Sequence, residues 1–103
     1  MATATDRFTV IFPEGYDAQS EYETPFRGYL SDVVVRLENG ARYRLFFIDP
    51  VRLQQELARH TQLGQAYFAE PNTIILPEVT TEAVRKAVGS LVREEYFSHV
   101  KSF

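Results

Sequence analysis

The segment from residue 29 to residue 48 constrains the fold most, because an apolar alternation runs into Glu38-Asn39-Gly40 and resumes beyond it. A two-residue loop at Asn39-Gly40 would put arginines and apolar side chains on the same face of a hairpin. A three-residue loop over 38–40, closed by a left-handed Gly40, keeps one face apolar. That face then holds Val33, Val35, Leu37, Ala41, Tyr43, Leu45 and Phe47. We therefore predict a β-hairpin in this register.

The opposite face of this hairpin mixes charged and apolar side chains. It carries Asp32, Val34, Arg36, Arg42, Arg44, Phe46 and Ile48. Arg36 and Arg42 fall directly opposite each other, and this repulsive pair needs a nearby acid such as Asp32, or a bound partner, to offset it. Burying unpaired guanidinium groups would cost on the order of several kcal/mol each, so we expect this face to stay open.

The open face has two candidate uses besides pairing within the chain. One is an anion or small-molecule site lined by Arg36, Arg42, Arg44, Val34 and Phe46. The other is a homodimer contact, in which the apolar strip of Val34, Phe46 and Ile48 meets its copy in a second chain.

Two further segments have strand character. Residues 8–12 alternate and end at Pro13-Glu14-Gly15, which predicts a short first strand. Residues 66–68 and 73–76 flank Glu70-Pro71-Asn72-Thr73, a sequence typical of a type I turn, so we predict a second hairpin there. Residues 1–6 are expected to be disordered.

Two helices are indicated by their end signals. Asp49 can cap free backbone N–H groups, Pro50 suits the first helical position, and Gly64 suits the left-handed position that ends the helix. Thr80 can cap a last helix. The helix that begins after Asp49 has an apolar stripe of Leu53 and Leu57, and the last helix has one of Val84, Val88 and Leu91. We expect these five side chains to be buried together.

This element order predicts one α+β domain over residues 1–103. We expect a two-layer fold with a mostly antiparallel sheet of about five strands and both helices on one face. The layout resembles that of many small bacterial α+β proteins, a group that includes inhibitor and immunity proteins.

Composition and motifs exclude several kinds of chemistry. The chain has no Cys and a net charge of −3, so we expect no thiolate chemistry and no nucleic-acid partner. It lacks an apolar stretch for a membrane span and a signal core, which favours a cytoplasmic protein. His60 and His99 have no metal or catalytic partners at recognisable spacing. We expect no enzyme activity, no metal and no cofactor.

Residues 13–28 lack an apolar period and are predicted to form a long loop rich in acids and aromatics. The aromatics could simply fold back onto the sheet edge while the acids keep the loop soluble. Alternatively, aromatics supply contact area and acids steer a basic partner. On that reading the partner-binding residues are Tyr16, Asp17, Glu21, Tyr22, Glu23 and Phe26. The sequence thus favours a non-catalytic protein-interaction module of the inhibitor or immunity type.

Overall fold

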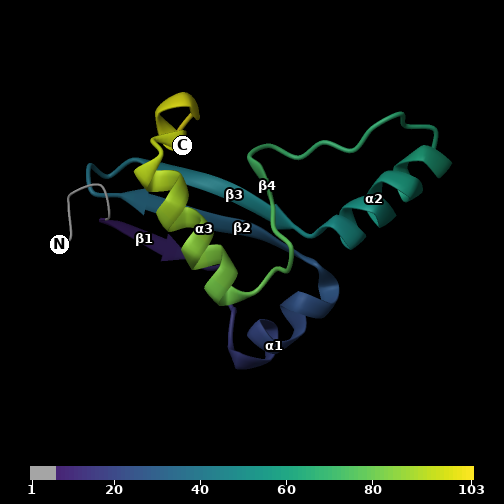
Figure 1. Cartoon of the computed structure of the whole chain (residues 1–103), viewed down its shortest axis with the longest axis horizontal. Coiled ribbons are helices and arrows are strands. Elements are labelled where there is room, and N and C mark those ends of the chain that lie inside the picture. The colour runs from purple at the N-terminus through teal and green to yellow at the C-terminus, as the bar shows by residue number, and fades with distance from the viewer. Residues whose placement is uncertain (1–6) are drawn as a thin grey trace.

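The computed structural model describes residues 7–103, so the expectation of disorder in residues 1–6 lies outside the described part. The elements, in chain order, are β1 (Phe8–Ile11), α1 (Ala18–Arg27), β2 (Tyr29–Leu37), β3 (Arg42–Ile48), α2 (Pro50–Gln62), β4 (Thr73–Ile75), α3 (Thr81–Arg93) and the 3₁₀ turn η2 (Tyr96–His99). The strands form one open, mixed sheet in the order β1-β2-β3-β4 (Figure 1). The α+β class predicted from the sequence is confirmed.

The predicted hairpin of β2 and β3 forms in the predicted register. Val35 lies opposite Tyr43, and Arg36 lies opposite Arg42. The loop closes with Gly40 at φ +90°, where a side chain would be strained. The Asn39 side chain stabilises the turn by accepting a hydrogen bond of 2.9 Å from the Ala41 N–H.

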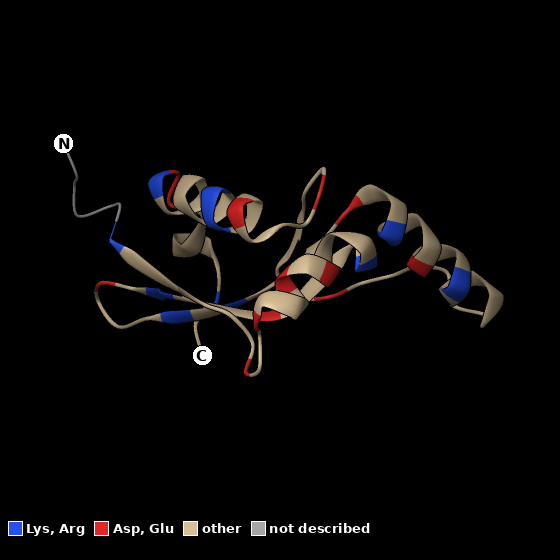
Figure 2. Cartoon of the chain, turned by 90° about the horizontal axis from the view of Figure 1, so that it is seen from below, with Lys and Arg blue, Asp and Glu red and all other residues tan. Residues whose placement is uncertain are grey.

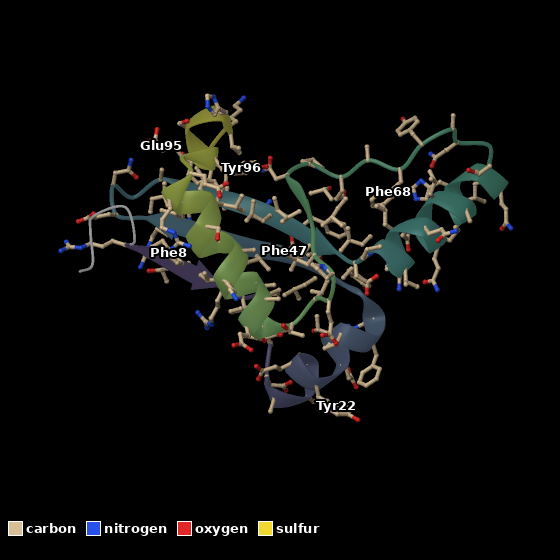
Figure 3. All side chains as sticks on the ribbon, in the orientation of Figure 1. Phe8, Tyr22, Phe47, Phe68, Glu95 and Tyr96 are labelled. Atoms are coloured by element: carbon tan, nitrogen blue, oxygen red, sulfur yellow. The ribbon has the colours of Figure 1, made fainter. Side chains whose placement is uncertain are left out.

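The core lies between the sheet and α3, which crosses the strands (Figure 1). Val84 and Val88 of α3 are fully buried against hairpin residues such as Val33 and Phe47, as the apolar pattern predicts. Figure 3 shows Phe47 beside α3, toward β4. The turn η2 adds Phe97, whose ring centroid lies 4.7 Å from that of Tyr43. The predicted core face of the hairpin therefore meets α3.

The sheet has four strands among the described residues, and the prediction of about five mostly antiparallel strands was wrong in part. Residues 66–68 do not form a strand, so the second hairpin is absent. Strand β4 instead pairs with β3 in parallel, with Phe46 opposite Thr73 and Ile48 opposite Ile75. The reason is that the chain leaves β3 through α2 and returns beside it in the same direction, which a tight hairpin turn could not achieve.

Helix α2 does not cover the sheet, contrary to the prediction of both helices on one face. It projects beyond the ends of β2 and β3 (Figure 1), and none of its residues is buried. Leu57 of its apolar stripe is 44% exposed, so the five predicted residues are not buried together. The first turn of α2 is held against the end of α1, where the Asp49 N–H donates to the Gly28 carbonyl at 2.8 Å.

The segment 13–28, which we predicted as a long loop, contains helix α1, which the sequence did not predict. Asp17 caps it by accepting a hydrogen bond of 2.9 Å from the Ser20 N–H, and Gly28 ends it at φ +79°. Pro25 lies inside the helix. None of the helices in residues 7–103 is long and apolar enough to cross a membrane.

Candidate functional site

The outward side of α1 carries two exposed aromatic rings. Tyr22 is 71% exposed and Phe26 is 77% exposed, and their ring centroids lie 5.5 Å apart. They are four residues apart, which places them on the same side of the helix. Figure 3 shows Tyr22 directed away from the rest of the molecule. We call Glu21, Tyr22, Glu23 and Phe26 the α1 surface.

The inward side of α1 is polar instead of apolar. Thr24 is fully buried and satisfies its hydroxyl by donating 2.7 Å to the Ser20 carbonyl. Ser20 is half-buried. A surface helix normally turns its apolar side to the core, and α1 does the reverse. Two large rings are therefore left in water on an inverted helix, and exposed apolar surface of this kind is a candidate interaction site.

Acidic side chains surround the exposed rings. Glu21 and Glu23 are exposed on either side of Tyr22, and Glu14 and Asp17 are exposed just before the helix. Figure 2 shows acidic positions on α1 and a basic one at its end. Two hydrogen bonds from Ser20 hold the pKa of Asp17 below its ordinary value. The bond from the backbone N–H has the larger effect and the bond from the hydroxyl the smaller one. Asp17 is therefore ionised at neutral pH.

Tyr16 is not part of the α1 surface. It is half-buried and its ring stacks on Phe12, with centroids 4.8 Å apart. Its hydroxyl lies 2.8 Å from Oγ1 of Thr81 at the start of α3. Of the six predicted partner-binding residues, the structure brings Glu21, Tyr22, Glu23 and Phe26 together, places Asp17 at the helix start and uses Tyr16 for internal packing.

The open sheet face is partly occupied by the C-terminal segment. The guanidinium groups of Arg42 and Arg44 lie 4.9 and 4.6 Å from the ring centroid of Phe103. The Phe103 N–H also donates 3.0 Å to the Arg42 carbonyl. Arg44 Nε lies 3.8 Å from Oδ1 of Asp32, whereas the sequence placed Asp32 as the acid that offsets the opposed Arg36 and Arg42.

The apolar strip of that face is smaller than expected. Val34 and Phe46 are half-buried, and Ile48, which we placed on the open face, is fully buried next to the start of α2. Arg36 remains exposed opposite Arg42. The homodimer contact and the anion site on this face stay predictions.

A groove that the sequence did not predict lies between α2 and residues 63–72, which lead from α2 back to β4 and which we call the returning segment. It has a volume of about 300 Å³. Its aromatic walls are Tyr29, Phe46, Phe68 and His60, and its charged rim is Arg52, Glu56, Arg59 and Glu70. We call it the aromatic groove. No local pattern could reveal it, because β2, β3, α2 and the returning segment each contribute one or a few residues.

Comparisons with known proteins add no further identification. No known protein family, no curated protein and no solved structure matches the chain. Within residues 7–103, no three His, Asp or Glu side chains gather where they could hold a metal ion. The absence of enzyme activity stays a prediction.

Proposed function

We propose that the chain is a small, non-catalytic, cytoplasmic interaction module of the inhibitor or immunity type, which binds a basic partner protein through the α1 surface. The observation that carries the proposal is the inverted helix, with Tyr22 and Phe26 in solvent and Thr24 in the interior.

The chemistry of the α1 surface fits a protein partner. Aromatic side chains are enriched among residues that dominate binding energy, because they bury a large area at a low cost in conformational entropy. Glu21 and Glu23 flank the rings, so a basic partner is attracted over a distance and aligned on contact. A partner with an apolar pocket rimmed by Lys or Arg would satisfy both properties.

One helix side is smaller than the roughly 800 Å² per partner of a standard interface, so the contact must extend further. A hollow of about 210 Å³ adjoins α1 and is lined by Glu14, Ser20 and Ser31 among others. Glu14 and Arg27 both line this hollow, so it offers the same partner one acidic and one basic contact beside α1.

The test is affinity capture from a native lysate with matched baits. The α1 variant carries Tyr22→Ser and Phe26→Ser. The control variant carries Leu63→Ser and Tyr67→Ser, which remove side chains of similar exposure near the far end of α2. We expect a basic protein to be retained by the wild type and the control and lost by the α1 variant. Thermal unfolding should show all three baits folded.

Binding kinetics with the captured protein then separate the two parts of the surface. Glu21→Gln with Glu23→Gln should slow association at low salt, because steering is lost, while Tyr22→Ala should mainly speed dissociation. If the α1 variant keeps its affinity for every captured protein within about twofold, the proposal is wrong.

A further inference from the structure

The aromatic groove is independent of the α1 surface and is lined by a chain of rings. The ring centroids of Tyr29 and Phe46 lie 6.3 Å apart, those of Phe46 and Phe68 lie 6.2 Å apart, and that of His60 lies 5.4 Å from Phe68. Figure 3 shows Phe68 between the returning segment and α2. Tyr29, Phe46 and Phe68 are only half-buried, so flat apolar surface remains for a ligand to cover.

The α2 side of the groove carries an excess of positive charge. The carboxylate of Glu56 is 13% exposed and pairs with two guanidinium groups, at 2.9 Å from Arg52 and 2.6 Å from Arg59. One carboxylate neutralises only one of the two cations. Arg52 is fixed further, since its guanidinium lies 4.7 Å from the Tyr29 ring centroid and donates 3.3 Å to the Arg27 carbonyl. Arg59 is 58% exposed, so an anion can reach it.

The opposite side of the groove carries Glu70, and this determines how an anion would lie. The Glu70 carboxylate repels a negatively charged group of a ligand, whereas Arg52 and Arg59 on the α2 side attract it. A ligand with a negative group at one end must therefore point that group toward α2. Its apolar part then lies over Phe46 and Phe68, which line the groove between these two sides.

We propose that the aromatic groove binds a planar aromatic carboxylate, with its ring against Phe46 and Phe68 and its carboxylate paired with Arg59 and Arg52. The groove volume of about 300 Å³ is at the lower end of the range for small-molecule sites, which fits a ligand of one or two fused rings. Glu56 holds both guanidinium groups in place before the ligand arrives.

The test uses two probes of nearly equal shape, 2-naphthoate and the uncharged 2-naphthamide. Each is titrated into the isotope-labelled chain while backbone amide chemical shifts are recorded. We expect shifts at Phe46, Phe68 and Arg59, and an affinity about tenfold higher for the carboxylate than for the amide. Equal affinities, no binding at millimolar probe, or shifts centred on Tyr22 and Phe26 would each overturn the proposal.

Matched variants assign the two parts of the groove. Arg59→Gln should remove most of the preference for 2-naphthoate, and Lys86→Gln, which removes one positive charge from α3, should leave it unchanged. Phe68→Ala should weaken both probes alike, because the stacking wall is lost. Glu70→Gln should strengthen 2-naphthoate only. If Lys86→Gln and Arg59→Gln have the same effect, only overall charge attracts the probe and the site is refuted. Because these variants leave the α1 surface intact, their failure would not affect the proposed function.

Discussion

Gly28 and Asp49 lie in direct contact where α1 and α2 meet. The Asp49 N–H donates 2.8 Å to the Gly28 carbonyl, and a Cβ on Gly28 would lie 2.8 Å from Oδ2 of Asp49. Asp49 cannot easily move aside, because its Oδ1 accepts a 2.7 Å hydrogen bond from the Arg52 N–H as the cap of α2. This contact therefore sets the direction in which α2 leaves the sheet.

Gly28→Ala should cost more stability than Gly40→Ala. Both glycines have positive φ, of +79° and +90°, so each change incurs roughly 1–2 kcal/mol of backbone strain. Only Gly28 has atoms in the way, whereas a Cβ on Gly40 would meet nothing within 4 Å. Urea unfolding should give a cost for Gly28→Ala at least about 1 kcal/mol larger. Equal costs would mean that Asp49 can move away freely.

Leu45→Ala and Leu57→Ala make the same chemical change in two environments. Leu45 is 1% exposed in the core, and its truncation should cost about 2–5 kcal/mol. Leu57 is 44% exposed on α2, so we expect less than about 1 kcal/mol in the free chain. Chemical denaturation of both variants measures the difference. A Leu57→Ala cost near that of Leu45→Ala would show that α2 packs more closely in solution.

Glu56 should make the stability of the chain depend on acid pH. Hydrogen bonds from Arg59, which has the largest effect, and from Arg52 lower the pKa of Glu56. Burial acts in the opposite direction. A carboxyl whose pKa is lowered in the folded state stabilises that state at pH values above its ordinary pKa of 4.5, and this stabilisation is lost as the pH falls through the folded pKa.

The measurement compares the free energies of unfolding of the wild type and Glu56→Gln as the pH is lowered. The difference should stay constant from about pH 7 to about pH 5 and shrink below about pH 4. Both proteins also carry His60→Gln, because the Nε2 atom of His60 lies 3.8 Å from Glu56 Oε1 and would otherwise interact with this carboxylate. A difference that grows toward low pH would mean that folding raises the pKa of Glu56 and that burial outweighs the two arginines.

Local patterns were sufficient to predict the hairpin and the starts of α2 and α3. The loop 38–40 was expected to contain three residues because a two-residue loop would mix charge with apolar surface, and the caps Asp49 and Thr80 act within one turn. Helix α1 was missed because Tyr22 and Phe26 face water and Thr24 faces the interior, which removes the usual apolar period. Pro25 lies inside this helix, a position that proline usually disfavours.

Contacts between distant segments could not be predicted in the same way. The choice of β3 as the parallel partner of β4 depends on the path of the chain through α2, and local propensity carries no information on it. The acidic and aromatic composition of residues 13–28 drew attention to Tyr22 and Phe26, which the structure exposes, and their role in binding stays a prediction. It could not separate them from Tyr16, whose partner Thr81 is 65 residues away. The aromatic groove likewise depends on the path of the chain through α2 and the returning segment.

The parallel pairing of β4 with β3 has a consequence for the order of folding. Strands β2 and β3 are joined by a three-residue loop, so their contacts close with little loss of chain entropy. Strand β4 reaches β3 only after α2 and the whole returning segment have been closed into one large loop. The hairpin is therefore suited to form in the folding nucleus, and β4 is suited to join after the rate-limiting step.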